Sequence, residues 1–307
     1  MINTAWCKCE LDNFLNQKKK EGWEASTLCM YRSAVTRFCE FLVNKELLAF
    51  STITPKMIKE FNRSDRHLTV DGKNAYNIKI KKFLQFMEQK EMLPYGLHQA
   101  LYCSAAVKEK IVITLSDEEK AEIYRKYKIC TTQTELRNHA ILLLGMKMGL
   151  RSSDIVKIEL QDINWNCQTI RILQKKTCHE IVLPMPTEVG NAIYLYIKNA
   201  RPKTDCRSVF IKTRAPFNTV QRGVCLNALK STLPERDCVG SGFHVTRKTF
   251  ATDQICREVG RHMIADMLGQ RDTSSLSRYL NLDSDRMFMC PLSLLETGLT
   301  MKGERYD

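Results

Sequence analysis

The spacing of apolar residues near the start of the chain limits the possible fold more than any other feature of the sequence. Two series recur at steps of three and four: Leu28, Tyr31, Val35, Phe38 and Leu42, and then Tyr76, Ile80, Phe83 and Met87. Such steps place side chains on one face of an α-helix, so each series predicts an amphipathic helix. Turn-forming residues at 51–55 and 63–72 separate the helices. The first part of the chain is therefore expected to be a small helical bundle.

A different pattern begins after a boundary expected near residues 104–113. Ser116 and Glu119 have the spacing of a capping box, which predicts that a helix begins there. The apolar stretch that follows predicts a buried helix over 136–150, ending at Gly149.

Two short runs then change the predicted secondary structure from helix to strand. Residues 169–173 and 180–183 are rich in Ile, Val and Leu, and they flank a polar segment that contains Lys175 and Lys176. This arrangement predicts a β-hairpin with the two lysines at or near its turn. From residue 187 the pattern is again mostly helical, so the expected fold class is mainly α with a small β-sheet.

The charge of the chain points to a polyanionic partner. Its 307 residues include 47 Lys and Arg against 34 Asp and Glu, a formal net charge of +13. Nucleic acids and anionic membranes both attract such a protein. The most apolar run, 140–150, is interrupted by Lys147 and falls far short of the roughly 20 residues of a membrane span. The first ten residues have no secretory signal pattern. A nucleic acid is therefore favoured over a membrane.

Cysteine usage gives no sign of a metal centre. The 13 cysteines are scattered along the chain, and no cluster of Cys and His has the spacing of zinc ligands. Scattered cysteines in an intracellular protein are usually small, reduced, buried side chains. No metal and no cofactor is expected.

Four segments of the second part of the chain contain residues suited to chemistry at a phosphate. In order they hold Arg151 with Asp154, the two hairpin lysines, His244 with Arg247 and Lys248, and Leu268-Gly269-Gln270 followed by Tyr279. This ordered series resembles the tyrosine recombinase (phage integrase) family over about residues 116–279. The helical first part is similar to the core-binding domain of that family in size and pattern only. No single motif is decisive, whereas the ordered set is highly specific.

The resemblance implies a domain plan. The expected architecture is a two-domain, C-shaped clamp with a helical, SAM-like core-binding domain and a mixed α+β catalytic domain. The expected divisions are 1–106 for the DNA-binding domain, 107–115 for the linker, 116–279 for the catalytic domain and 280–307 for a C-terminal tail. The tail is apolar, and in the family this segment docks on a neighbouring protomer. Docking on its own core is the alternative.

The chemistry of a phosphodiester suggests roles for two arginines and a tyrosine. The transition state gathers negative charge on the non-bridging oxygens, which two guanidinium groups can hold without losing protons. Arg151 and Arg247 are the candidates, and they match the two arginine positions of the family. A phenol can attack phosphorus and later leave again. Tyr279, at the family's position after the Leu-Gly turn, is the expected nucleophile, and Tyr306 is its rival.

Proton transfer needs further groups, because a free tyrosine has a pKa of about 10. His244 matches the histidine of the family's His-x-x-Arg motif and is the expected proton shuttle. A buried structural histidine is the alternative interpretation. Lys176 precedes a threonine, as in the Lys-Thr pair of many members, and is expected to protonate the leaving 5′-oxygen. Lys175 is the alternative for that role and is otherwise expected to contact DNA.

Two positions depart from the family pattern. Gln270 stands where the family usually has His or Trp, and its amide can donate a hydrogen bond to a phosphate oxygen without adding charge. The alternative is that Gln270 only caps the Leu-Gly turn. Lys248 stands where His is common and is expected to contact the DNA backbone.

The expected function is site-specific DNA recombination of the integrase or transposon recombinase type. The resemblance implies strand exchange through a 3′-phosphotyrosine and a Holliday junction, by a homotetramer on double-stranded DNA in the bacterial cytoplasm, associated with the nucleoid. Further DNA contacts are expected from Lys79, Lys81 and Lys82, on the side of their helix opposite the apolar series. The alternatives are a non-cleaving DNA-binding protein of the same fold and a type IB topoisomerase-like enzyme.

Overall fold

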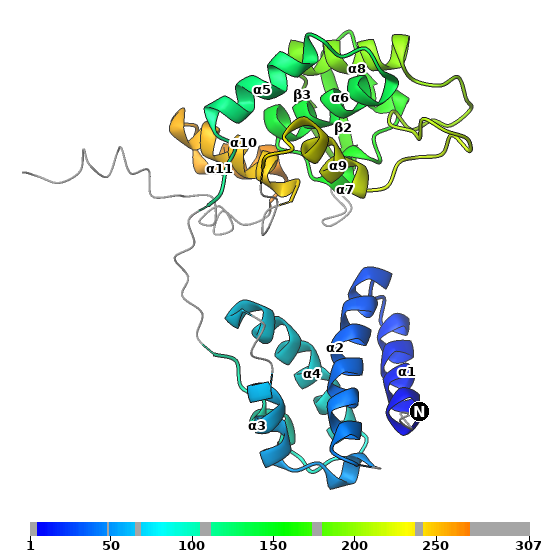
Figure 1. Cartoon of the computed structure of the whole chain (residues 1–307), viewed down its shortest axis with the longest axis vertical. Coiled ribbons are helices and arrows are strands. Elements are labelled where there is room, and N and C mark those ends of the chain that lie inside the picture. The colour runs from blue at the N-terminus through cyan, green and yellow to red at the C-terminus, as the bar shows by residue number, and fades with distance from the viewer. Residues whose placement is uncertain are drawn as a thin grey trace, which may run out of the picture. The chain divides into compact units, whose positions relative to one another are not determined.

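The computed structural model of the chain describes residues 5–47, 49–64, 69–104, 112–173, 180–236 and 242–270. The chain divides into two compact units, residues 1–110 and 111–307 (Figure 1). Each unit has a hydrophobic core of its own. The roles assigned to the domains from the sequence stay predictions.

The first unit is built from helices. In chain order they are α1 (Ala5–Lys20), α2 (Ala25–Asn44), the 3₁₀ turn η1 (Phe50–Thr52), α3 (Pro55–Ser64), α4 (Val70–Gln89) and the 3₁₀ turn η2 (Leu97–Ala100). The two helices expected from the apolar series are confirmed as α2 and α4. Aromatic rings join the helices: Phe14 of α1 meets Phe83 of α4 edge to face with 5.5 Å between ring centroids, and Phe38 of α2 meets Phe61 of α3 at 5.1 Å.

The sequence predicts that Lys79, Lys81 and Lys82 of α4 share the side opposite the apolar series, and the structure differs from this prediction. Lys79 and Lys81 are half-buried, and Lys82 is exposed. The ammonium group of Lys79 lies 6.0 Å from the ring centroid of Tyr76, a member of the apolar series. Residues three apart are neighbours on a helix, so Lys79 borders that face instead of opposing it. Lys82 extends over the ring of Trp23 at 5.5 Å.

The second unit combines helices with a small sheet. Its elements are α5 (Asp117–Tyr127), α6 (Gln133–Met148), α7 (Ser152–Ile155), the 3₁₀ turn η3 (Leu160–Asp162), β1 (Ile163–Asn164), β2 (Thr169–Leu173), β3 (Glu180–Pro184), α8 (Thr187–Asn199), α9 (Gly223–Thr232), α10 (His244–Cys256) and α11 (Arg261–Leu268). The capping box of Ser116 and Glu119 is confirmed at the start of α5. A second box, of Thr132 and Glu135, begins α6.

The sheet is antiparallel in the order β1-β2-β3. The predicted hairpin strands are confirmed as β2 and β3, with Ile170 opposite Leu183 and Arg171 opposite Val182. Ile170, Ile172 and Leu183 are buried, whereas Val182 is exposed, so one face of the hairpin packs on the core. The two-residue strand β1 was not expected from the sequence.

Helix α6 forms the centre of the second unit. It packs against α8, α9, α10 and α5 (Figure 1), and it is buried on all sides, including the residues from Arg137 to Met146. A helix that is apolar around most of its circumference must be enclosed in this way. Its C-terminus is the scaffold of the candidate site.

The entry of the chain into the second unit is tied to α10 and its surroundings. The backbone N–H of Leu115 donates to Thr249 Oγ1 of α10 at 2.8 Å. Arg236 Nη2 donates to the carbonyl of Thr114 at 3.2 Å, and Lys120 Nζ pairs with Asp253 of α10 at 3.1 Å. Three independent contacts therefore join the beginning of this unit to its late-sequence elements.

The predicted fold class is confirmed, because the described residues are mainly helical with one small antiparallel sheet. Among these residues, no helix is both long and apolar enough to cross a membrane.

Candidate active site

The turn after α6 places Arg151. Gly149 ends α6 in the left-handed conformation, with φ 63° and ψ 21°. A Cβ at this position would lie 2.6 Å from Phe250 Cδ1 and 2.8 Å from Leu268 Cδ2. Both the backbone angle and the lack of space therefore require glycine. Two residues later Arg151 caps the short helix α7, half-buried at the surface of the unit.

Arg247 lies beneath this turn and joins two helix ends. Its Nη1 donates to the carbonyl of Gly149 at 2.7 Å, and its Nη2 donates to the carbonyl of Leu268 at 2.8 Å. These carbonyls end α6 and α11, where the partial negative charge of each helix favours a cation. Only 1% of Arg247 is exposed. The side chain thus holds together the turn that leads to Arg151 and the turn that leads to Gln270.

The second of these turns repeats the geometry of the first. Gly269 adopts the left-handed conformation with φ 58° and ψ 48°. The backbone N–H of Gln270 then donates to the carbonyl of Ala265 at 2.8 Å. Gln270 therefore follows directly after a fixed helix end.

The close approach of α10 to α6 brings Arg247 into reach of Gly149. At Gly145 of α6 a Cβ would lie 2.5 Å from Thr246 Oγ1 and 2.8 Å from Phe243 Cζ. Thr246 is completely buried, and its hydroxyl donates to the carbonyl of Phe243 at 2.9 Å. Gly145 is not among the residues selected from the sequence. An isolated glycine inside a buried helix is the signal of such close packing.

Arg151 is held beside a buried carboxylate. Asp154, 3% exposed, places Oδ2 at 3.8 Å from Arg151 Nη1, and Ser153 Oγ donates to its Oδ1 at 3.1 Å. Arg151 Nη1 and Asp154 Oδ2 are both buried, and neither makes a hydrogen bond. The ion pair therefore orients the guanidinium group beside the end of α6.

His244 begins α10 and shares the electrostatic field of these cations. The surrounding protein and then the charges of Arg247, Lys248 and Arg151 lower its pKa from 6.5 to about 4. His244 is exposed at the surface of the unit. The three cations and the protein around the ring nevertheless disfavour a positive charge on its imidazole. His244 is therefore a neutral imidazole at neutral pH.

The structure thus brings together four of the residues selected from the sequence: Arg151, His244, Arg247 and Lys248. Gln270 follows the turn that Arg247 holds. Lys175, Lys176, Tyr279, Tyr306 and the tail 280–307 lie outside the described residues. Among the described residues, no group of three or more His, Cys, Asp or Glu side chains is arranged to hold a metal ion.

Comparison with known proteins adds the family context. Residues 115–286 match the model of the phage integrase family. The putative integrase/recombinase y4gC of Sinorhizobium fredii is 33% identical over 172 residues, which cover 55% of this chain and 88% of that protein. Tyrosine recombinase XerC of Staphylococcus haemolyticus is 25% identical over 287 residues, 89% of this chain and 92% of that protein.

A solved structure shows that the likeness extends to the fold. A lambda integrase (residues 75–356) dimer bound to a COC′ core site aligns with a TM-score of 0.69 at 15% identity, covering 89% of this chain and 94% of that one. The family match includes Arg151, His244, Arg247 and Gln270. This chain belongs to the phage integrase family of tyrosine recombinases.

Proposed function

We propose that this protein is a site-specific DNA recombinase that cuts and rejoins strands through a covalent bond between Tyr279 and a 3′-phosphate. The observation that carries the proposal is the cluster of cations around one neutral histidine. Arg247 is bonded to the end of α6 at Gly149, and Arg151, Arg247 and Lys248 all lower the pKa of His244. Concentrated positive charge beside a neutral proton acceptor suits attack on a phosphodiester anion.

In the proposed first step, the Tyr279 oxygen forms a bond to phosphorus and the bond from phosphorus to the 5′-oxygen breaks. The phenolic proton passes to His244, and Lys176, or alternatively Lys175, gives a proton to the departing oxygen. Arg151 donates to a non-bridging oxygen, and Arg247 adds its charge from beneath the surface. Gln270 adds a neutral hydrogen bond.

The arriving phosphate would also prepare His244 for its role. Its negative charge offsets the cations that disfavour protonation, so the pKa of the imidazole rises as DNA binds. A neutral histidine in the free protein thus becomes a stronger base when the substrate is in place. This makes the cation cluster compatible with general base catalysis.

The second step reverses the first with a different strand. The 5′-hydroxyl of a partner strand attacks the phosphotyrosine, and Tyr279 leaves. The energy of the broken phosphodiester is kept in the covalent intermediate, so the scheme requires neither a cofactor nor a metal ion. Two rounds through a Holliday junction, in a tetramer that exchanges the tails 280–307 between protomers, complete recombination.

Covalent capture tests this proposal directly. A pool of nicked suicide duplexes with a randomised core is incubated with the protein, and denaturing gels then detect DNA that is attached to it. The wild type and Tyr306→Phe should form the adduct, also in EDTA, whereas Tyr279→Phe should bind DNA without forming it. An adduct with Tyr279→Phe that is lost in Tyr306→Phe would assign the chemistry to the other tyrosine.

Covalent capture together with a plasmid-relaxation assay separates the rival functions. Duplex binding without any adduct would identify a non-cleaving DNA-binding protein. Relaxation of supercoiled plasmid without sequence preference would identify a topoisomerase. Arg151→Ala should slow capture by about 10²–10³, the usual cost of removing one preorganised donor to the transition state. Arg151 is a cleaner test than Arg247, whose replacement also removes two buried hydrogen bonds.

A further inference from the structure

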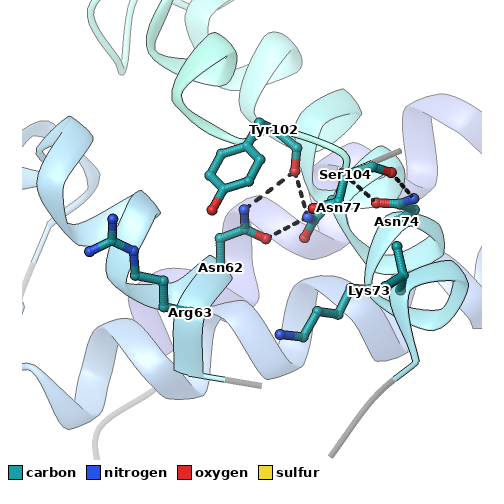
Figure 2. Close-up of a pocket in the computed structure, with 8 residues that line it drawn as sticks. Asn62, Arg63, Lys73, Asn74, Asn77, Tyr102 and Ser104 are labelled. Carbon is teal, nitrogen blue, oxygen red and sulfur yellow. Dashed lines mark hydrogen bonds between the residues drawn. The ribbon is translucent and has the colours of Figure 1, made fainter. Parts of the chain in front are cut away.

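A cavity in the first unit has the features of a phosphate-binding site and is separate from the candidate active site of the second unit. It has a volume of about 410 Å³ and lies between the end of α3, the beginning of α4 and the segment at Tyr102 (Figure 2). Arg63 and Lys73 both line it. Figure 2 shows Lys73 extending below Asn62 from α4, while Arg63 projects from α3 and the ring of Tyr102 stands beside Asn62.

Hydrogen bonds between amides fix the walls of this cavity. Asn77 Nδ2 donates to Asn62 Oδ1 at 2.6 Å and to the carbonyl of Tyr102 at 2.9 Å. Asn62 Nδ2 donates to the same carbonyl at 3.3 Å (Figure 2). Asn77 is 4% exposed and Asn62 is 9% exposed. These buried bonds make the cavity a preformed site, which lowers the entropic cost of binding.

Within the described part of the chain, the two cations at the cavity have no partner of opposite charge. Among the described residues, neither Arg63 nor Lys73 forms an ion pair, whereas Arg32 pairs with Asp12 at 2.8 Å and Lys45 pairs with Glu60 at 3.0 Å. The residues that line the cavity include this arginine and lysine but no carboxylate, which keeps a positive field in the cavity. Lys73 lies in the first turn of α4, which also carries Asp71, a residue outside the cavity lining.

We propose that the Arg63–Lys73 cavity binds a backbone phosphate of duplex DNA. The inference rests on the proposed function, because the net charge of +13 and the recombinase family make DNA the polyanion concerned. Arg63 supplies a bidentate donor and Lys73 a point charge, the two cation types that proteins use for phosphate. Tyr102, 49% exposed, presents its ring to the sugar beside that phosphate.

The lysines of α4 selected from the sequence are less suited to this contact. Lys79 donates to the carbonyl of Ala75 at 2.6 Å, and Lys82 lies over Trp23. Both ammonium groups are thus already engaged within the unit. The proposal therefore moves the expected phosphate contact of α4 from its middle to its first turn.

The salt dependence of DNA binding tests the proposal. Anisotropy of a fluorescein-labelled duplex of arbitrary sequence is measured with the full chain over a KCl series. Each phosphate contact contributes about 0.9 to the slope of log K against log salt. The Arg63→Gln, Lys73→Gln double variant should therefore lower the slope by about 0.9 relative to wild type. Arg32→Gln, which removes one exposed but paired charge of the same unit, is the matched control and should lower the slope less.

Ethylation interference identifies the phosphate itself. Ethylation of one particular backbone phosphate should block binding of the wild type. Ethylation of the same phosphate should not weaken binding of the double variant. Arg63→Lys combined with wild-type Lys73 retains the charge and should restore most of the slope. If the double variant loses its far-UV circular dichroism signal, the single Lys73→Gln variant is expected to show the same missing ethylation position.

Different failures lead to different conclusions. A slope and an ethylation pattern unchanged from the Arg32→Gln control would overturn the proposed phosphate site and leave the proposed function intact. A wild-type protein that binds no duplex would overturn the proposed function itself. Saturable binding of inorganic phosphate that the double variant loses, with unchanged duplex binding, would show a small-anion site and overturn the DNA contact.

Discussion

Two histidines of the second unit have the same lowered pKa for different reasons. The pKa of His139 is lowered from 6.5 to about 4 by burial alone. His244 reaches about 4 through the surrounding protein together with the charges of Arg247, Lys248 and Arg151. Only the second set of causes includes charges that a phosphate can offset. The pair therefore contrasts a histidine whose pKa depends on burial alone with one whose pKa also depends on neighbouring cations.

We expect DNA to raise the pKa of His244 and to leave that of His139 unchanged. The bound phosphate compensates the cations around His244, but it cannot alter the dry environment of His139. Imidazole NMR signals of the Tyr279→Phe variant, titrated with and without bound duplex, measure the pKa of both histidines in one sample. Equal shifts at the two histidines would indicate a general conformational change and count against a phosphate beside His244.

The sequence pattern selects candidate site residues, but it does not predict how they pack. Arg151, His244 and Arg247 were selected because each stands in a short motif, and their catalytic roles stay predictions. The burial of Arg247 depends on carbonyls at Gly149 and Leu268, which approach it only after three helices have packed. No pattern around Arg247 specifies those partners. The expected role of Arg247 was therefore contact with the phosphate oxygens alone, without its bonds to the two helix ends.

At the scale of elements, the crossing of α6 and α10 determines whether the site can form. The two helices approach so closely that Gly145 has no room for a Cβ beside Thr246. One turn further along α6, the carbonyl of Gly149 accepts a hydrogen bond from Arg247 of α10. A small displacement of α10 would therefore separate Arg247 from Gly149 and move His244.

Gly145→Ala is expected to destabilise the second unit by about 1–3 kcal/mol, the usual cost of overpacking, and to slow covalent capture. Gly223→Ala is the matched control, because a Cβ at that first residue of α9 meets no atom within 4 Å. Alanine is the better helix former by about 1 kcal/mol, so propensity alone would stabilise both variants. Urea unfolding followed by circular dichroism decides the sign, and a Gly145→Ala protein as stable as the control would contradict the tight crossing.

Elements with local signals were predicted, and those without them were missed. The capping box at Ser116 and the runs rich in Ile, Val and Leu at 169–173 and 180–183 each consist of a few consecutive residues, so α5 and the β2–β3 hairpin could be predicted directly. Strand β1 has two residues and no periodicity of its own. It exists because Ile163 pairs with Ile170 of a strand that is specified independently.

At the scale of the whole molecule, the second unit is expected to lose stability in acid. His139 is 4% exposed, and its ring stacks on Tyr127 with 3.9 Å between centroids. Its pKa is about 4 when folded and about 6.5 when unfolded. The unfolded state therefore binds more protons between these values, and stability falls as the pH drops from about 6.5 to about 4, by about 3 kcal/mol for this group.

His139→Phe should reduce this acid sensitivity, because phenylalanine keeps the stacked ring and cannot bind a proton. Urea unfolding at a series of pH values from neutral to acid measures the effect. The variant should show a shallower decline than wild type over the same window. Parallel curves for the two proteins would mean that His139 does not titrate differently on unfolding.

The hydrogen bond between Leu115 and Thr249 also has a consequence for the order in which the two units fold during synthesis on the ribosome. It joins residues 134 positions apart, whereas the described contacts of the first unit close among residues 5–104. Domains fold as units while synthesis proceeds from the N-terminus, so the helical bundle is complete while α10 has yet to be translated. A nascent chain stalled before Thr249 would present a finished bundle and an unfinished second unit without His244 and Arg247 in place. The first unit therefore completes its fold during synthesis before the residues of the candidate active site come together.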